Sequence, residues 1–372
     1  MSVPMEIRGY AAFDESGEYK PFRYKPRELL PHDVMIKISA CGICFSDIHM
    51  ARSGWGKTHY PVCPGHEIVG TVVATGSDVS LVQTGQRVGV GPQVFSCQQR
   101  EHECRMCATQ RDGYCAEKVK AYGYRWANGD MSYGGYADHV LADEAHVFEI
   151  PAALSDADAA PLLCAGTTLF SPLRHFGCDE NTRVGILGLG GLGHLGVQFA
   201  KAMGAHVTVL SRTHSKEALA RSLGADAFVA TSSEEEMKAA SCSLDRLLVT
   251  ANGNNLDYDA FADLVDVDGA MILVGLPEEG KCTVTPSKLV LRRMSVAGSW
   301  VGSRHDMRDM LQLAAEKGVK PMLEVAPMSD CNEQTRRVID NEVRFRVVLT
   351  PDFDATGAAD GDDVPTTSMA DA

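Results

Sequence analysis

The chain has 372 residues, which is enough for two domains of ordinary size and a tail. Its 49 acidic side chains outnumber the 35 basic ones, and the formal net charge of −14 argues against binding to nucleic acid or to anionic membranes. No run of about 18 apolar residues could span a bilayer, and residues 1–20 lack the apolar core of a signal peptide. We therefore expect a cytoplasmic protein with neither a nucleic-acid nor a membrane partner.

The first 150 residues are predicted to form a β-rich domain. Residues 33–40 alternate apolar and polar side chains, as a half-buried strand does. The β-branched run 67–75 ends in turn-forming residues, and 85–90 is predicted to be another short strand. Because no long helical pattern interrupts this region, a compact domain resembling a β-barrel is the simplest interpretation.

Strand and helix signals alternate from about residue 152 onward. Helices are predicted at 191–203 and 214–223, between strands at 183–187, 206–210, 246–250, 270–274 and 294–298. This alternation predicts a parallel doubly wound sheet, so the fold class is α/β. A helix over 304–317 and a closing strand over 344–349 follow. The segment 351–372 carries six aspartates and no Lys or Arg, and its composition predicts an acidic disordered tail.

A glycine-rich loop follows the strand at 183–187 and opens the next helix. It reads G-x-G-x-x-G over residues 188–193. Gly188 permits a tight turn, Gly190 lets a pyrophosphate approach the backbone, and Gly193 lets helix and strand pack closely. The phosphates would lie at the helix N-terminus, where free N–H groups favour an anion, beside Gly191 and Leu192. The strand–loop–helix context favours dinucleotide binding over an ordinary glycine turn.

The end of the next strand predicts which dinucleotide is bound. A carboxylate there would accept a hydrogen bond from the ribose 2′-OH of NAD. The sequence instead has Ser211, Arg212 and Lys216, whose hydroxyl and cations suit the 2′-phosphate of NADP(H). The alternative is that Arg212 and Lys216 only solvate the start of a helix.

Three widely separated segments supply thiolate and imidazole groups. Cys44, His66 and Cys164 form the ligand set of a catalytic zinc with one open position. Each residue alone is weak evidence, because a buried Cys is usually a small core residue. Their occurrence together, shortly before the glycine loop, favours a metal site.

Three segments of the sequence resemble the zinc-dependent medium-chain alcohol dehydrogenases, and in particular their cinnamyl alcohol dehydrogenase branch with its NADPH-dependent members. These segments are GHEIVG (65–70), PLLCAGTT (161–168) and GLGGLGHLGVQFAKAMGA (188–205). The resemblance covers about residues 5–350. It implies a GroES-like catalytic domain (1–151), a Rossmann domain (152–297), a return segment completing the catalytic domain (298–350), and a homodimer.

Residue roles are also implied by the resemblance. Cys44, His66 and Cys164 match the zinc ligands, and Glu67 matches a carboxylate that can replace water on the metal. Asp47 matches a group that orients His66. Cys41 matches no ligand and is interpreted as structural.

The resemblance further implies a proton relay and a nicotinamide site. Zinc would polarise the substrate oxygen, Ser46 would accept the alcohol proton, and His49 would deliver it to bulk water while hydride passes to the nicotinamide. Positions that match the surroundings of the nicotinamide are Thr168, Ser299 and Trp300.

A second cysteine cluster has the composition of a structural zinc site. Its spacing is C-x6-C-x2-C-x7-C, over Cys97, Cys104, Cys107 and Cys115. The family usually shows C-x2-C-x2-C-x7-C, so the first interval is longer here, and Glu101 stands where a cysteine is usual. We favour Cys97 as the ligand, with residues 98–103 bulging out. Glu101 or His102 as the fourth ligand, or no metal, are the alternatives. The expectation is two zinc ions per chain.

The predicted function is reversible hydride transfer between NADP(H) and a primary alcohol or aldehyde of aromatic or medium-chain type. Trp55 and Trp300 match pocket-lining regions, although both suit an ordinary core. An NAD(P)-dependent polyol dehydrogenase is the alternative activity. The ligand set argues against a zinc-free quinone or enoyl reductase, and the cofactor loop argues against a zinc-ribbon binding module. Regulation by oxidation of Cys63 is a further hypothesis.

Overall fold

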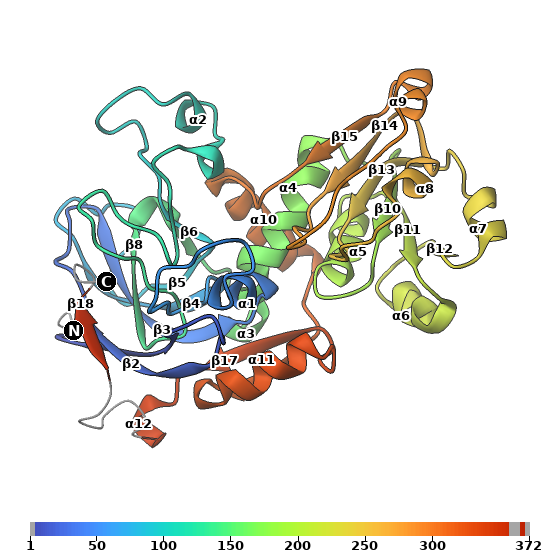
Figure 1. Cartoon of the computed structure of the whole chain (residues 1–372). Coiled ribbons are helices and arrows are strands. Elements are labelled where there is room, and N and C mark those ends of the chain that lie inside the picture. The colour runs from blue at the N-terminus through green and yellow to red at the C-terminus, as the bar shows by residue number, and fades with distance from the viewer. Residues whose placement is uncertain (1–3, 357–364, 369–372) are drawn as a thin grey trace. The chain divides into compact units, whose positions relative to one another are not determined.

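The computed structural model describes residues 4–356 and 365–368 (Figure 1). The chain divides into two compact units. Unit 1 comprises Met1–Cys164, Ser303–Ala315 and Pro321–Ala372, and unit 2 comprises Ala165–Gly302 and Glu316–Lys320.

The first boundary lies later in the chain than the sequence predicted. It falls after Cys164 rather than after residue 151, because helix α3 (Asp156–Pro161) packs against strands β3 (Asp33–Gly42) and β4 (Ile68–Thr75) of unit 1. The chain returns to unit 1 at Ser303 rather than at residue 298. Unit 1 therefore contains Cys164 together with the other predicted zinc ligands.

Unit 1 is β-rich, as predicted. Its largest sheet has the strand order β16-β17-β3-β4-β5-β9, and β8 also pairs with β3. A smaller sheet has the order β1-β2-β18, and β6 pairs with β7. The remaining strands of these sheets are β1 (Ile7–Ala12), β2 (Tyr19–Lys25), β5 (Arg87–Val90), β6 (Gln93–Phe95), β7 (Val119–Lys120), β8 (His139–Asp143), β9 (Val147–Glu149), β16 (Leu323–Pro327), β17 (Arg346–Thr350) and β18 (Thr366–Ser368).

Short helices lie between the strands of unit 1. Helix α1 (Phe45–Ala51) follows β3 directly, and the π-helical turn η3 (Leu162–Gly166) follows α3. The other helical elements of the unit are α2 (Arg105–Ala108), η1 (Asp112–Tyr114), η2 (Glu144–His146), η5 (Met328–Asp330), α11 (Cys331–Ile339), α12 (Phe353–Thr356) and, as far as Ala315, α10 (Arg304–Lys317).

Unit 2 is a doubly wound parallel sheet, which confirms the predicted fold class. Its strand order is β12-β11-β10-β13-β14-β15, and all neighbouring strands are parallel. This order is that of dinucleotide-binding folds, in which the first strand lies beside the fourth. The strands are β10 (Arg183–Leu187), β11 (His206–Ser211), β12 (Ala227–Ala230), β13 (Leu244–Val249), β14 (Val265–Leu273) and β15 (Ser295–Gly298).

The helices of unit 2 precede or connect these strands. Helix α5 (Gly193–Ala202) links β10 to β11, and the turn η4 (His214–Lys216) precedes α6 (Glu217–Ser222). The remaining helices are α4 (Thr167–His175), α7 (Glu234–Ala239), α8 (Tyr258–Ala262) and α9 (Pro286–Arg292). No described helix has the length and hydropathy needed to cross a bilayer.

The prediction of disorder over 351–372 is wrong for the described part of that segment. Phe353 of α12 is buried and its ring stacks on Tyr10 at 5.6 Å, while Asp354 forms an ion pair with Arg8 at 2.7 Å. Strand β18 pairs in parallel with β2. One buried aromatic ring and an available strand edge thus order residues whose composition alone favours disorder. Residues 357–364 and 369–372 lie outside the described part of the chain.

Candidate active site and metal centres

Four potential metal ligands converge in unit 1. The ligand atoms of Cys44, His66, Glu67 and Cys164 all lie within 4.8 Å of one another. Cys44 immediately precedes α1, His66 and Glu67 immediately precede β4, and Cys164 lies in η3. The structure therefore brings together the predicted zinc ligands from three distant segments. Two thiolates and one imidazole suit Zn²⁺, so this donor set fits the metal.

Asp47 holds two of the ligand segments in place. Its carboxylate accepts a hydrogen bond from the backbone N–H of Cys44 at 2.9 Å and lies 2.9 Å from Nδ1 of His66. It also accepts from the backbone N–H of Gly65 at 3.1 Å. Nε2 of His66 lies 3.2 Å from Sγ of Cys164, and in the neutral imidazole with Nδ1–H donating to Asp47 its lone pair is free to bind a metal.

The electrostatics of the four groups favour a charged site. The hydrogen bond from Cys164, together with nearby His66, lowers the pKa of the Cys44 thiol well below its usual value, although burial opposes this. The same hydrogen bond and burial raise the pKa of Cys164. Burial lowers the pKa of His66, but the negative charge of Asp47 outweighs it, so the pKa is raised. A cation beside these groups would compensate the buried negative charge.

Glu67 is fully buried and is paired with an arginine that the sequence analysis missed. Arg346 of β17 donates to one carboxylate oxygen of Glu67. The other oxygen, Oε2, has no hydrogen-bond partner among the described residues. Burial raises the pKa of Glu67 to about 7, although the charge of Arg346 opposes the shift. A Cβ at position 42 would overlap Oε2, which explains why Gly42 stands there. In the sequence, the one feature that could have indicated this contact is the charged Arg346 in the otherwise apolar run 346–349.

The predicted relay residues lie on α1 beside the ligands. Oγ of Ser46 is 3.6 Å from Sγ of Cys44. The ring of His49 is buried and stacks on Trp55, with centroids 4.6 Å apart and planes at 27°. Trp55 is itself 37% exposed, so it is not an ordinary core residue. Another aromatic neighbour, Tyr122, was not predicted, and its hydroxyl lies 3.3 Å from Nδ1 of His66.

The second cysteine cluster also forms as predicted. The four Sγ atoms lie within 4.8 Å of one another, with Cys97–Cys107, Cys97–Cys115 and Cys104–Cys115 distances of 3.6, 3.7 and 4.0 Å. Four thiolates at the corners of a tetrahedron around zinc would be separated by about 3.8 Å. The geometry therefore favours Cys97 as the fourth ligand. Glu101 does not join the cluster.

The backbone of the loop 188–193 explains why glycine stands at several of its positions. Gly188 has φ of +96°, which favours glycine. A Cβ on Gly193 would overlap the carbonyl oxygen of Gly188, so only glycine fits at the start of α5. A Cβ on Gly190 would meet no atom within 4 Å, which leaves room for a ligand. Gly191 and Leu192 complete the loop.

The residues after β11 lie close to this loop. Nζ of Lys216 donates to the carbonyl oxygen of Leu189 at 2.8 Å, so this side chain does more than solvate a helix start. Arg212 is exposed, and Ser211 ends the strand. A contact that was not predicted is made by His214, which pairs with Glu217 at 2.8 Å and Glu236 at 2.9 Å.

The three positions expected near the nicotinamide also belong to unit 2. Thr168 is buried in α4, whereas Ser299 and Trp300 directly follow β15 and are half-buried. The backbone N–H of Ser299 donates to Leu273.

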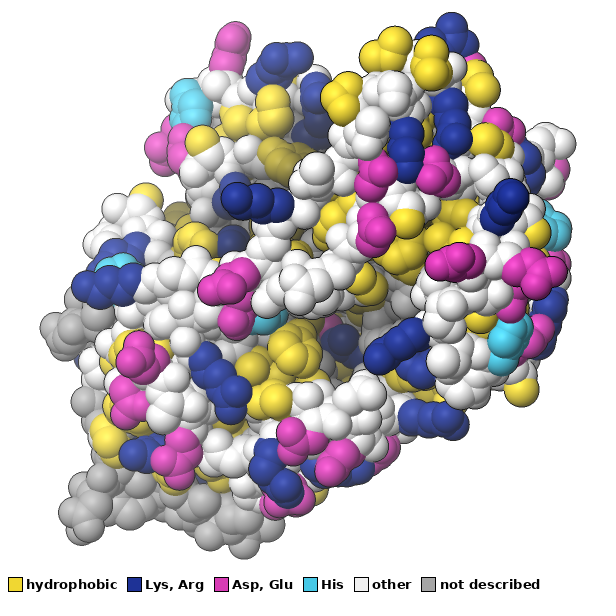
Figure 2. Space-filling model, turned by 45° about the vertical axis from the view of Figure 1, so that its right-hand side comes forward, with side chains coloured by type: hydrophobic (Ala, Val, Ile, Leu, Met, Phe, Trp, Pro, Cys, Tyr) yellow, Lys and Arg dark blue, Asp and Glu magenta, His cyan; other side chains and the backbone are white. Residues whose placement is uncertain are grey.

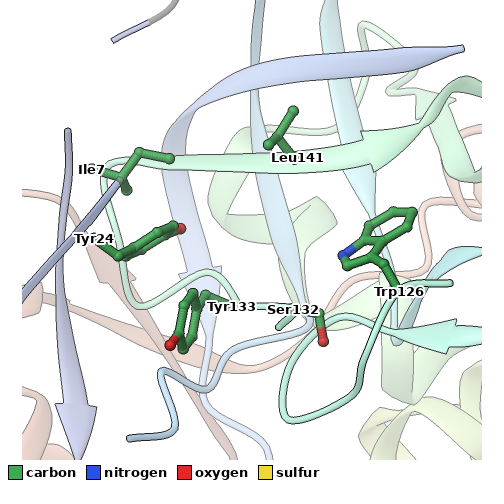
Figure 3. A pocket seen from close by; sticks show the side chains of 6 residues that line it. All are labelled: Ile7, Tyr24, Trp126, Ser132, Tyr133 and Leu141. Carbon is green, nitrogen blue, oxygen red and sulfur yellow. The ribbon is translucent and has the colours of Figure 1, made fainter. Parts of the chain in front are cut away.

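Figure 3 shows six side chains that line a small pocket in unit 1. None of the candidate residues lines it. Nε1 of Trp126 and the hydroxyl of Tyr133 are buried there without a hydrogen-bond partner among the described residues, and such groups commonly bind an internal water. The lining residues are Ile7, Tyr24, Trp126, Ser132, Tyr133 and Leu141.

Comparison with known proteins identifies the family. The chain matches the "Alcohol dehydrogenase GroES-like domain" over residues 30–152 and the "Zinc-binding dehydrogenase" domain over residues 191–316. Vomilenine reductase from Rauvolfia serpentina is 42% identical over 349 residues, covering 93% of this chain and 95% of the relative. The chain belongs to the zinc-binding alcohol dehydrogenase family.

Solved structures of this dehydrogenase family agree with the fold described above. A cinnamyl alcohol dehydrogenase from Sorghum bicolor has a TM-score of 0.87 and 37% identity, covering 93% of this chain and 97% of its own. A CAD from Helicobacter pylori complexed with NADP(H) has a TM-score of 0.86 and 30% identity, and the match covers 94% of this chain and 99% of that one. The resemblance stated from the sequence motifs is thereby confirmed, and the chain is an oxidoreductase that acts on CH–OH groups.

Proposed function

We propose that this dehydrogenase uses NADP(H) to interconvert primary alcohols and aldehydes of aromatic or medium-chain type. The observation that carries the proposal is the convergence of Cys44, His66 and Cys164, with a buried carboxylate beside them. Support for the substrate class comes from the cinnamyl alcohol dehydrogenase from sorghum, and support for the cofactor comes from the NADP(H) complex.

Each group of the site has a proposed role. Zinc held by Cys44, His66 and Cys164 would supply Lewis-acid polarisation of the substrate oxygen. Asp47 keeps Nε2 of His66 available as a ligand atom by accepting from Nδ1–H. In alcohol oxidation, the hydroxyl of Ser46 accepts the substrate proton, which then passes to His49 and to solvent.

The cofactor assignment rests on unit 2. NADP(H) would supply or accept the hydride. The backbone of the loop 188–193 would hold the pyrophosphate at the start of α5. Ser211, Arg212 and Lys216 would hold the 2′-phosphate, since no carboxylate follows β11 to bind the ribose of NAD. Thr168, Ser299 and Trp300 are proposed to surround the nicotinamide.

A second zinc ion is proposed at the four cysteines of residues 97–115. Four thiolates close the coordination shell and leave no position for a substrate, so this ion would be structural. The twelve cysteines are free thiols in the structure. Because thiolate sites and free thiols persist in reducing compartments, we place the enzyme in the cytoplasm.

We propose a homodimer on two grounds. One is the resemblance to the medium-chain alcohol dehydrogenases, and the other is the edge of the parallel sheet of unit 2 at β15. Strand β15 ends the sheet order and pairs only with β14 among the described strands. Large apolar side chains lie exposed at and near this edge, in particular Val290, Leu291 and Val296. Figure 2 shows hydrophobic side chains gathered on the surface of the lobe that carries α9. An exposed edge with apolar neighbours is commonly covered by a second copy.

The deciding experiment measures NADPH oxidation by the purified enzyme with cinnamaldehyde or benzaldehyde, with and without a zinc chelator. Fast reduction that the chelator abolishes would support the proposed metal, cofactor and substrate class together. The polyol dehydrogenase alternative predicts instead that NADH and ketoses such as fructose are the better pair. Failure with every aldehyde while zinc and NADPH still bind would overturn the substrate class only.

A further inference from the structure

A second group of metal-binding side chains shares one residue with the four-cysteine site. Ligand atoms of Cys97, His102 and Glu117 lie within 4.8 Å of one another. Sulfur, imidazole nitrogen and carboxylate oxygen are all ligands of zinc. Neither His102 nor Glu117 belongs to the four-cysteine site, so this group is a second set of candidate ligands that overlaps the first only at Cys97.

Residues 98–103, which lengthen the interval between the first two cysteines of the cluster, hold His102 in this position. Two of its residues, Gln98 and Gln99, have φ of +53° and +59°, and the backbone N–H of Arg100 donates to the carbonyl oxygen of Cys97 at 3.0 Å. The guanidinium of Arg100 forms a two-pronged ion pair with buried Asp143. The bulge is therefore a turn tied to unit 1 rather than a loose loop, and it brings His102 back toward Cys97.

Burial divides the surroundings of Cys97 into an inner and an outer side. Cys97 is 5% exposed and its sulfur lies 3.6 and 3.7 Å from those of Cys107 and Cys115. The side chains of His102 and Glu117 are 48% and 52% exposed, and Nε2 of His102 lies 2.8 Å from Oε1 of Glu117. Cys97 is thus common to a buried thiol cluster and to a pair of ligands open to solvent.

An ion enters and leaves a closed tetrahedral site slowly, and His102 and Glu117 would make this exchange faster. Four thiolates leave no open position, so an ion can enter or leave only by exchanging ligands one at a time. An additional nitrogen and oxygen ligand next to one thiolate would hold the ion during this exchange.

We propose that Cys97, His102 and Glu117 form an entry position through which Zn²⁺ passes into and out of the four-cysteine site. The thiol of Cys97 would first release its proton to solvent and bind the ion together with His102 and Glu117. The thiols of Cys104, Cys107 and Cys115 then each release a proton to solvent and replace the outer ligands, while Cys97 stays bound. Exit is the reverse. This inference rests on the proposed structural zinc.

The test follows metal exchange in the whole enzyme loaded with Co²⁺, whose absorption distinguishes a tetrathiolate site from one with two thiolates and an imidazole. Loss of the tetrathiolate band after addition of EDTA gives the exit rate, and its growth in apoenzyme gives the entry rate. Variants His102→Gln and Glu117→Gln are compared with His305→Gln, which removes an equally exposed histidine paired with Asp309 elsewhere in unit 1.

We expect entry and exit to slow by on the order of tenfold in the His102 and Glu117 variants, comparable to the loss of other supporting groups around metals. The final cobalt content, the spectrum and the melting temperature should match the wild type, and His305→Gln should exchange normally. Unchanged rates would overturn the entry position. A lost metal equivalent or an altered spectrum would also overturn it, because His102 would then be a permanent ligand. If the wild type shows no tetrathiolate band, the structural zinc assignment itself fails.

Discussion

Asp47 makes three polar contacts that involve or flank the metal ligands, with Cys44, Gly65 and His66. Asp47→Asn keeps the size of the side chain but removes its charge. We expect zinc in the catalytic site to bind about 10- to 100-fold more weakly, because a neutral amide polarises His66 less. Competition with a chromogenic chelator measures the change. Asp309→Asn, which changes a half-buried carboxylate paired with His305, serves as the control and should bind zinc normally.

The ion pair between Glu67 and Arg346 is fully buried. Arg346→Met would leave the carboxylate buried without its cation, and we expect a loss of about 3–5 kcal/mol in the free energy of unfolding. Urea denaturation measures this loss. Removing both charges in Glu67→Gln/Arg346→Met should cost less than the single change.

The matched control for this prediction is Arg336→Met, which removes an exposed arginine paired with Glu333 on α11. Exposed pairs contribute only about 0–1 kcal/mol, so this variant should unfold almost as the wild type does. An equal loss in the two arginine variants would contradict the assigned role of burial.

At the scale of single residues, the sequence predicted ligands better than their supporting groups. Cysteine and histidine are typical zinc ligands, so their residue types alone made Cys44, His66 and Cys164 candidates. Arg346 lies in a strand far along the chain, and only the fold places it against Glu67. Glu117 was missed for the same reason, since no spacing rule connects it with His102.

Among the elements, strands with strong local patterns were predicted most accurately. The bounds of β10 and α10 match the predictions of 183–187 and 304–317. Strand β14 begins at Val265, whereas the sequence predicted a start at 270. The prediction missed the first residues because they include two aspartates and a glycine, and the register with β13 shifts there. Strand β2 contains Pro21, and its buried residues Tyr19, Phe22 and Tyr24 do not follow a regular alternation, so the sequence does not show it as a half-buried strand.

The turn η4 carries the prediction about the cofactor. Lys216→Met removes a cation and its hydrogen bond to Leu189. A charge-assisted hydrogen bond contributes about 1.5 kcal/mol or more, so we expect KM for NADPH to rise about tenfold with little change in kcat. KM for NADH should change much less, and steady-state kinetics with both cofactors measures the difference. Lys238→Met, on exposed α7, is the control; equal effects on both cofactors would contradict a 2′-phosphate role.

For the whole molecule, the exposed apolar residues of α9 carry the prediction about assembly. Val290 and Leu291 are 76% and 82% exposed. Val290→Asp/Leu291→Asp should convert a dimer to monomers, because charge would be buried at the contact. Light scattering during size exclusion measures the mass. Leu81→Asp, which changes an exposed leucine of unit 1, should leave the dimer intact, and a monomeric wild type would refute the proposal.

The placement of Cys164 at the end of the first stretch of unit 1 has a consequence for folding. A metal bound to Cys44, His66 and Cys164 joins residues 120 positions apart in the chain. By analogy with a disulfide, closing a loop of about 100 residues restricts the unfolded chain by up to about 4.7 kcal/mol. The four-cysteine site closes only the short stretch from 97 to 115. The catalytic metal would therefore act as a removable long-range cross-link, which ties the stability of unit 1 to the supply of zinc.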